Sequence, residues 1–242
     1  MGIFKLGARG PWRSVGLSHA GLKRQHNEDR LLNMPEKGVW AVADGMGGHD
    51  RGEVASEIVI DCLRSEAGTG DDLTASILKA HREICRHPSA PDSRMGTTTV
   101  ALRIQAQSLN FELAWVGDSR AYQIRQDEMR QLSRDHTLVN ELLERGVVTA
   151  EEAAVHPERS VLSRAVGRAG EGKLQIDRKL GQCRRGDLFV LCSDGLHGVV
   201  GDEKMHAALR GPWSLDYKAR RLQDLAMQAG APDNVSLILV QL

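Results

Sequence analysis

The sequence predicts a protein that combines β-strands and α-helices around a substantial hydrophobic core. The chain has 242 residues, of which 41% are hydrophobic, which is close to the average for soluble globular proteins. Short runs with the pattern of strands recur along it, and segments with helical spacing lie between them. No internal repeat, low-complexity tract or Pro/Gly/Ser-rich linker divides the chain. We therefore expect a single domain over residues 1–242.

Several segments have the pattern of β-strands. Residues 109–116 alternate between two sets of side chains, which predicts a strand with one buried face. Residues 235–240 are apolar at most positions of both sets, which predicts a central or sandwiched strand. The other runs are short and are bounded by polar turns. The strands expected in this way cover residues 39–43, 109–116, 122–124, 129–132, 188–192 and 235–240.

Helices are expected between these strands. Apolar side chains at the i, i+4 spacing of a helix face occur in residues 53–63, 73–85 and 215–229. Gly230 follows the last of these, where a helix C-cap favours glycine. Residues 135–168 are less regular, with a short helix expected near their start. We interpret residues 135–168 as a flap-like excursion on the domain, of the kind that forms lids or contacts substrates.

The overall composition narrows the class of protein. Lys plus Arg and Asp plus Glu each number 32, so the balanced charge gives no general attraction to nucleic acid or to an anionic membrane. The four cysteines include no C-x-x-C pair, and Cys62 and Cys192 lie in apolar runs, which suits a reducing compartment. The chain shows no signal-peptide pattern and no run of the roughly 18 apolar residues typical of a membrane helix. We expect a soluble cytoplasmic protein.

Acidic residues recur at the ends of the expected strands. Asp44, Asp118 and Asp194 each follow an apolar run, and Asp233 stands just before another. Any one of them is most simply a turn residue, since Asp and Gly are common in turns. If the strand ends meet at one rim of a sheet, however, the carboxylates come together and require cations between them. Oxygen ligands suit Mg²⁺ or Mn²⁺, and two such ions activate a water for in-line attack on phosphorus.

The order of these motifs resembles that of a known family. The motifs match those of the type 2C (PPM) metal-dependent Ser/Thr protein phosphatases, in their short bacterial form. The similarity covers nearly the whole chain, and a set of ordered motifs is far more specific than any one of them. Overall length also resembles the subgroup associated with type VI secretion. The motifs are residues 24–29 (RQHNED), 44–56 (DGMGGHDRGEVAS), 95–98 (MGTT), 116–120 (VGDSR), 193–196 (SDGL) and 233–235 (DNV).

The resemblance implies a fold and a set of metal ligands. The implied fold is α+β, with a central β-sandwich of two mostly antiparallel sheets flanked by helix pairs in α-β-β-α layers. Two tightly bound Mn²⁺ or Mg²⁺ ions lie in a cleft at one end. Asp44 bridges both ions, and Asp194 and Asp233 complete the first site. The carbonyl of Gly45, together with Glu28, holds the second ion; a glycine lets the backbone approach closely.

The resemblance also implies further roles. Asp118 and Asp194 hold a third, weaker ion, and Arg24 grips the substrate phosphate, because a guanidinium binds two phosphate oxygens at once. Some members of the family carry a histidine two residues after the bridging aspartate as a general acid, but here that position is Met46. We therefore expect metal-bound water to be the proton donor, with His49 as the second choice.

The predicted function is hydrolysis of phosphoserine and phosphothreonine in proteins by a metal-activated water. We expect a monomer that opposes a Ser/Thr kinase and binds neither nucleic acid nor membrane. A non-catalytic phosphoprotein-binding module on the same fold is the main alternative, although such modules usually lack a metal aspartate. A nuclease or small-molecule phosphatase is a third reading. We also expect Asp135 and His136 to cap the helix that follows them.

Overall fold

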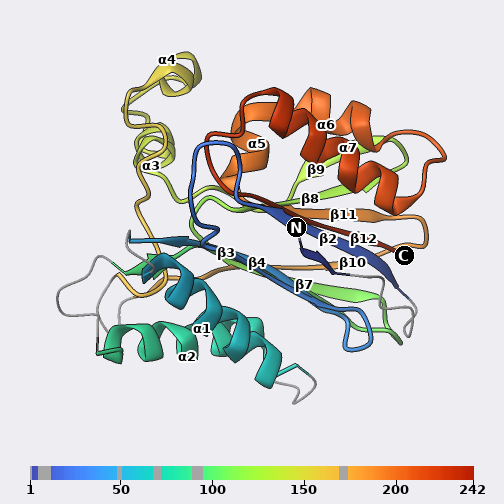
Figure 1. Ribbon diagram of the computed structural model, residues 1–242, viewed down its shortest axis with the longest axis horizontal. Helices are drawn as coiled ribbons and strands as arrows, with labels where there is room; N and C mark the ends of the chain where they lie inside the picture. Colours follow the sequence, from blue (N-terminus) through green and yellow to red (C-terminus); the bar gives the residue numbers. More distant parts are fainter. Residues whose placement is uncertain (1, 5–11, 48–50, 68–71, 89–94, 169–173) are drawn as a thin grey trace.

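Two β-sheets pack face to face and are covered by helices on both outer sides (Figure 1). The computed structural model describes residues 2–4, 12–47, 51–67, 72–88, 95–168 and 174–242. Within these residues every strand pairing is antiparallel. The arrangement has α-β-β-α layers, and the predicted α+β sandwich is confirmed.

The first sheet contains most of the C-terminal strands. It includes β2, which was not predicted, although Val15 and Leu17 alternate there with Ser14, Gly16 and Ser18. As predicted, the last strand is central: it lies between β2 and β11 and is buried along nearly its whole length. The strand order is β1 (Gly2–Phe4), β2 (Arg13–His19), β12 (Val235–Gln241), β11 (Leu188–Cys192), β8 (Arg120–Arg125) and β9 (Glu128–Gln131).

The second sheet contains β7, for which the prediction of one buried face is wrong. Its inner face packs between the sheets, but its outer face is also buried, because Ala114 and Val116 pack in the same cluster as α2. Glu112 on that face is 8% exposed and binds Arg178, with 2.9 Å between Oε1 and Nε. The order is β10 (Asp177–Gln182), β7 (Asn110–Val116), β6 (Thr99–Ile104), β4 (Val39–Met46) and β3 (Asp29–Met34), with β5 (Gly96–Thr97) paired to β4.

Helices α1 (Arg51–Ser65) and α2 (Leu73–Arg86) cover the outer face of the second sheet, as their apolar spacing predicted (Figure 1). Helix α7 (Leu215–Gln228) covers the first sheet, and Gly230 just beyond it has a φ of 97°. Helices α5 (Asp194–Val200) and α6 (Asp202–Leu209) lie beside α7. These two were not expected, because they are too short to show a helical period.

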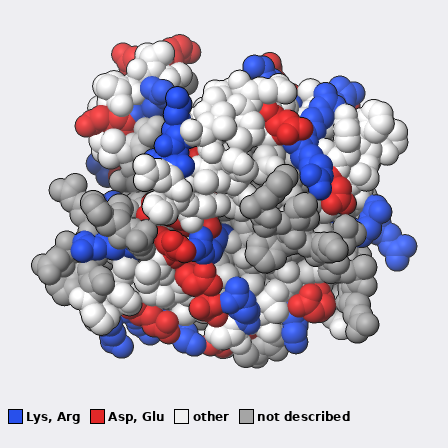
Figure 2. Space-filling model, viewed as in Figure 1, with Lys and Arg blue, Asp and Glu red and all other residues white. Residues whose placement is uncertain are grey.

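The hydrophobic core between the sheets contains Trp40, Phe189 and Leu191, all 0% exposed. Cys62 and Cys192 are buried free thiols, as expected from their apolar surroundings. Among the described residues, no helix combines the length and apolar character needed to cross a membrane. On the face shown in Figure 2, the basic and acidic side chains of the described residues are interspersed.

The excursion (residues 135–168) contains α3 (Leu138–Glu144) and α4 (Ala150–Val155) and projects beside the sandwich (Figure 1). The predicted cap of α3 is wrong. Thr137 is the N-cap and accepts a hydrogen bond from Asn140 N. Asp135 instead accepts hydrogen bonds from the Arg120 guanidinium, at 2.7 and 2.9 Å. An ion-pair partner so distant in sequence leaves no local signal, so Asp135 was mistaken for a cap.

Candidate active site

One pocket gathers the acidic residues that the sequence singled out. It has a volume of about 600 Å³ and lies where several strands of the two sheets end. Residues 160–165 and Arg168 of the excursion form another part of its lining. His49 lies outside the described residues. The predicted site residues that line the pocket are Arg24, Glu28, Asp44, Gly45, Asp118, Asp194 and Asp233.

Asp44 and Gly45 occupy the end of β4. The carbonyl of Asp44 accepts hydrogen bonds from Thr98 N and from the Thr97 hydroxyl, both at 2.9 Å. A Cβ atom at Gly45 would lie 2.2 Å from Gly52 O and 2.7 Å from Glu28 O. Glycine is therefore required here by the close packing of the first turn of α1 and of Glu28, the residue just before β3.

Asp118 follows Gly117, which has a φ of 101° and leaves no room for a side chain beside Thr98. Gly117 makes two hydrogen bonds with His136 at the start of the excursion, one as donor and one as acceptor. Its N–H donates to His136 Nδ1 at 3.1 Å, and its carbonyl accepts from His136 N at 2.9 Å. The carbonyl of Asp118 accepts a hydrogen bond from His197 Nε2 at 3.0 Å. The backbone that carries Asp118 is thus anchored to both the excursion and α5.

Asp194 and Asp233 are brought together by a close contact between backbones. A Cβ atom at Gly195 would lie 1.9 Å from Asn234 O, so only glycine allows the start of α5 to approach this loop. Arg24 donates a hydrogen bond from Nη2 to Asp233 Oδ2 at 2.7 Å. This contact, together with the neighbouring carboxylates, raises the pKa of Arg24, which therefore stays charged.

Asn234 links the loops around the pocket, a role that the sequence reasoning missed. Its Nδ2 donates to Ala20 O and His26 O, both at 2.9 Å. Its Oδ1 accepts from Glu28 N at 2.8 Å. The side chain therefore fixes the segment that carries Arg24 and Glu28 against the segment that carries Asp233. The only sequence signal was its place in the DNV motif.

Asp29 was also missed as a site residue, although it stands next to Glu28 in the RQHNED motif. It is 2% exposed, and its register partner across the β3–β4 ladder is Asp44. The Ser193 hydroxyl donates to its Oδ2 at 2.9 Å, whereas its Oδ1 is buried without a hydrogen-bond partner. Burial raises the pKa of Asp29 to about 7. Repulsion from Asp194 and Asp233 adds to this rise, and hydrogen bonds partly oppose it.

The pocket concentrates negative charge in a buried place. Burial, and then the repulsion of Asp29, Asp194 and other carboxylates, raises the pKa of Asp44 well above its usual range. The same two causes raise the pKa of Asp118 to about 7. Burial and Asp233 raise the pKa of Asp194 as well. Like charges at this density favour either protonation or a bound cation, which removes the repulsion.

The donor set fits divalent metal ions. Carboxylate and carbonyl oxygens are the ligands that Mg²⁺ and Mn²⁺ prefer, and Asp194 Oδ1 is buried without a hydrogen-bond partner. Among the described residues, no group of three His, Cys, Asp or Glu side chains is already arranged to hold an ion. Asp233 is paired with Arg24. The donors thus fit in kind and place, and side-chain rotation must complete the geometry.

The chain is similar to known protein phosphatases. The family model described as Protein phosphatase 2C matches residues 9–171. The serine/threonine phosphatase stp of Listeria innocua is 38% identical, over 91% of this chain and 92% of its own. The serine/threonine protein phosphatase PstP of Mycobacterium tuberculosis is also 38% identical, over 94% of this chain and 44% of PstP. This chain therefore spans less than half of the length of PstP.

Solved structures share the whole fold. The crystal structure of Mycobacterium tuberculosis PstP has a TM-score of 0.87 and 36% identity, and covers 96% of this chain and 98% of that one. PppA, described as a key regulatory component of T6SS in Pseudomonas aeruginosa, has a TM-score of 0.83 and 32% identity, over 95% and 97%. A PstP catalytic domain in complex with two manganese ions has the same TM-score, with 33% identity over 95% and 97%.

The sandwich and its carboxylate-lined pocket define the class of metal-dependent phosphatases. This chain belongs to the protein phosphatase 2C family. The resemblance inferred from the motifs is thereby confirmed, and with it the assignment of the chain to the hydrolases.

Proposed function

We propose that this protein is a serine/threonine protein phosphatase that hydrolyses phosphoserine and phosphothreonine in other proteins. The observation that carries the proposal is the convergence of five carboxylates and Arg24 on one pocket, from segments spread over more than two hundred residues. The names of the relatives, which are serine/threonine phosphatases, support the substrate class. Every acidic residue that the motifs marked as a metal ligand lines the pocket, which disfavours a non-catalytic module.

The pocket would hold two divalent ions. In this proposal Asp44 is shared by both, Asp194 and Asp233 complete one site, and Glu28 with the Gly45 carbonyl completes the other. When bound, Mn²⁺ or Mg²⁺ neutralises the carboxylates and activates a water for in-line attack on phosphorus. The two manganese ions in the related PstP structure support two ions for this chain. Asp118 with Asp194 would hold a third, weaker ion.

Arg24 would bind the substrate phosphate. Its side chain is 55% exposed and lines the pocket, and its present partner Asp233 is itself a proposed metal ligand. A metal ion on Asp233 would compete for the same carboxylate, which leaves the guanidinium fork to bind phosphate oxygens. The proton for the leaving serine or threonine oxygen would come from solvent at the metals, with His49 as the second choice.

Asp29 and Asn234 would act as positioning residues. Asp29 is the register partner of Asp44 across the β3–β4 ladder and is bound by the Ser193 hydroxyl, next to Asp194 in the chain. Asn234 ties the Glu28 backbone to the Asp233 loop. Outer groups of this kind orient metal ligands, and their loss typically lowers metal affinity or activity by about 10- to 100-fold.

The remaining parts of the proposal concern the setting of the enzyme. We expect it to oppose a Ser/Thr kinase, to act in the cytoplasm as a monomer, and to bind neither nucleic acid nor membrane. We also expect residues 1–242 to form one phosphatase domain, with the excursion at its mouth. The balanced charge and the interspersed surface shown in Figure 2 support the absence of a nucleic-acid partner.

The test is phosphate release from phosphothreonine peptides with Mn²⁺ or Mg²⁺. We expect turnover that is lost in EDTA and restored by metal. Activity that persists in metal-stripped protein would defeat the proposal. Calorimetric titration with Mn²⁺ distinguishes the enzyme from the alternative of a non-catalytic phosphoprotein-binding module, because such a module should show no tight divalent site. Preferential turnover of DNA or nucleotides in the same assay would favour a different two-metal hydrolase.

A further inference from the structure

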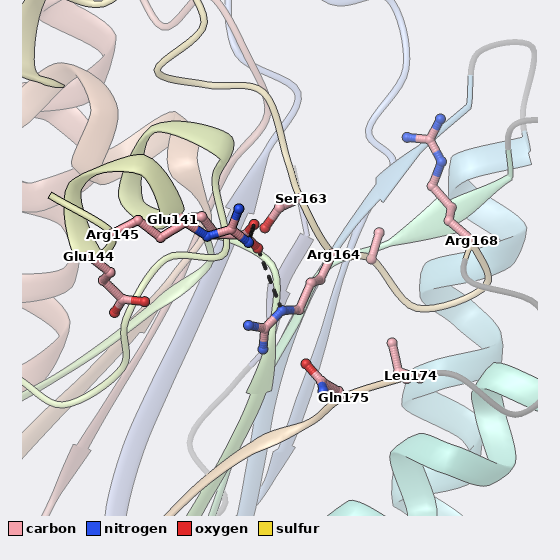
Figure 3. Close-up of a pocket in the computed structure, with 9 residues that line it drawn as sticks. Glu141, Glu144, Arg145, Ser163, Arg164, Arg168, Leu174 and Gln175 are labelled. Carbon is pink, nitrogen blue, oxygen red and sulfur yellow. Dashed lines mark ion pairs between the residues drawn. The ribbon is translucent and has the colours of Figure 1, made fainter. Parts of the chain in front are cut away.

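A second pocket adjoins the proposed catalytic pocket. It has a volume of about 480 Å³ and lies between α3 and the chain that leaves the excursion (Figure 3). The two pockets share Ser163, Arg164, Ala165 and Arg168, which therefore form a common wall. This wall offers a path for the residues that flank a phosphorylated side chain placed in the first pocket.

Most of the charges in the second pocket are already paired with each other. Arg164 Nη1 lies 3.1 Å from Asp177 Oδ1, and its Nε lies 3.9 Å from Glu141 Oε1. Arg145 Nη2 lies 3.9 Å from Glu141 Oε2 on the same helix. Figure 3 shows the Arg145 and Arg164 guanidinium groups converging on Glu141. Arg164 is therefore held by Asp177, and Arg145 lies near Glu141, both of them carboxylates of the protein itself.

Arg168 differs from them. In the described part of the chain, no carboxylate lies within ion-pair distance of its guanidinium, and its Nη1 is 3.4 Å from Met46 Sδ. The side chain is exposed and extends away from Leu174 and Gln175 (Figure 3). It lines both pockets. Its positive charge is therefore presented to whatever bridges the two pockets.

The backbone and stem of Arg168 are fixed to the body of the protein. Thr97 and Val166 exchange two backbone hydrogen bonds, at 3.0 and 2.9 Å, and Gly167 N donates to His81 Nδ1 at 2.9 Å. A Cβ atom at Gly96 would lie 2.7 Å from Arg168 Cγ and 2.9 Å from its Cδ, so the stem lies directly against the Gly96 backbone. A guanidinium held in this way loses little freedom when it binds an anion.

We propose that Arg168 is a specificity-determining residue that selects substrates with an acidic side chain next to the phosphorylated residue. The proposal rests on the proposed function, because it assumes that the phosphate occupies the acidic pocket. Arg24 contacts Asp233 among the carboxylates, whereas Arg168 stands on the wall that leads away from them. A flanking carboxylate would pair with Arg168, and a flanking lysine would be repelled by it.

The test uses phosphothreonine peptides that are identical except for Glu, Ala or Lys at one position beside the phosphothreonine. Both sides are examined separately with the metal-loaded enzyme. We expect wild-type kcat/KM to be about two- to fivefold higher for Glu than for Lys on one side, the size expected for one exposed ion pair. Arg168→Gln should remove the preference, Arg168→Glu should reverse it and Arg168→Lys should largely keep it.

The control is Arg185→Gln, which removes the same charge from an exposed turn outside both pockets. This variant should keep the wild-type preference, and thermal unfolding of each variant checks its fold. A wild type that does not distinguish Glu from Lys, or an Arg168→Glu variant that still prefers Glu, overturns the proposal. So does an equal loss by Arg168→Gln on all peptides and on a small aryl phosphate, which would show that Arg168 grips the phosphate. Failure of the wild type to turn over any phosphopeptide would instead refute the proposed function.

Discussion

The rim that carries the acidic pocket and the excursion beside it are held in different ways. At the rim, the backbone around Asp44 and Asp118 is fixed by several hydrogen bonds and by glycines in close contact with neighbouring chain. In the excursion, α4 contains no buried residue, and Val147 and Val155 are 64% and 78% exposed. The excursion is attached mainly at its two ends, through His136 and Val166.

This contrast separates two requirements of an enzyme. Groups that hold ions and reacting atoms must keep their positions closely, so they stand on buried strand ends. Groups that meet varied protein substrates can stand on less tightly packed segments, which open at low free energy. Arg168 lies at the junction, because the backbone just before it is bonded to the body of the protein while its side chain lines both pockets.

The largest effect is expected at the rim. Asp44→Asn should lower turnover of a phosphopeptide by more than about a hundredfold. Loss of a residue that only orients a metal ligand already lowers metal affinity or activity by about 10- to 100-fold, and Asp44 is a proposed direct ligand. The same change should leave the fold intact and stabilise the protein in EDTA, since it removes a buried charge that repels its neighbours. Activity and thermal unfolding measure these effects. Asp224→Asn on the exposed surface of α7 is the control and should change neither.

A second experiment compares packing in the two regions. Leu191→Ala removes a side chain that is 0% exposed between the sheets and should cost about 2–5 kcal/mol of unfolding free energy. Val155→Ala in α4, where the side chain is 78% exposed, should change it by less than about 0.5 kcal/mol. Urea denaturation gives both values. Equal losses at the two positions would show that the excursion is packed as firmly as the sandwich.

Metal ions should stabilise the rim directly. Mn²⁺ at about a hundred times its dissociation constant should add about 2.7 kcal/mol to the unfolding free energy, which corresponds to a rise in Tm of about 5–10 °C for a protein of this size. Thermal unfolding with and without MnCl₂ measures the shift without any substrate. The shift should be much smaller in Asp44→Asn. An unchanged Tm in the wild type would argue against a divalent site.

A smaller loss of stability than that of Leu191→Ala is expected where the two regions join. His136→Phe keeps an aromatic ring against Trp115 but removes the acceptor of the Gly117 N–H, and should cost about 1–3 kcal/mol. Burial and Arg164 lower the pKa of His136 below its ordinary value of 6.5, despite the opposing effect of Asp177. The folded protein therefore favours the neutral ring of His136, whereas in the unfolded chain the ring takes up a proton once the pH falls below about 6.5.

Because the folded pKa is lowered, the stability that His136 contributes is present above the unfolded pKa and declines as the pH falls below it. The difference in unfolding free energy between wild type and His136→Phe should therefore become smaller as the pH falls from about 7.5 to about 5.5. Urea denaturation at the two pH values checks this. A difference that widened in acid would show that His136 is protonated in the folded protein.

The sequence predicted the long helices, in which the helical spacing of apolar residues repeats over several turns. Helices α1, α2 and α7 were found within a few residues of their ends, because an apolar face repeats several times in each. Shorter elements were missed, such as α5, which begins directly at Asp194 after Ser193. The outer face of β7 was misread because Glu112 is polar, and its arginine partners come from other strands.

For the site, the sequence by itself determined which residues carry the chemistry: the carboxylates at strand ends, Arg24, and their order in motifs that identify the family. Only the tertiary structure decided how these residues are held. Asn234 joins separate loops, Asp29 lies beside Asp44 on the neighbouring strand, and Gly45 is required by the packing of α1. Periodicity and motifs report on neighbours along the chain, whereas these contacts join residues far apart in it, as Arg24 and Asp233 are at a separation of 209. Only folding brings such partners within hydrogen-bond distance.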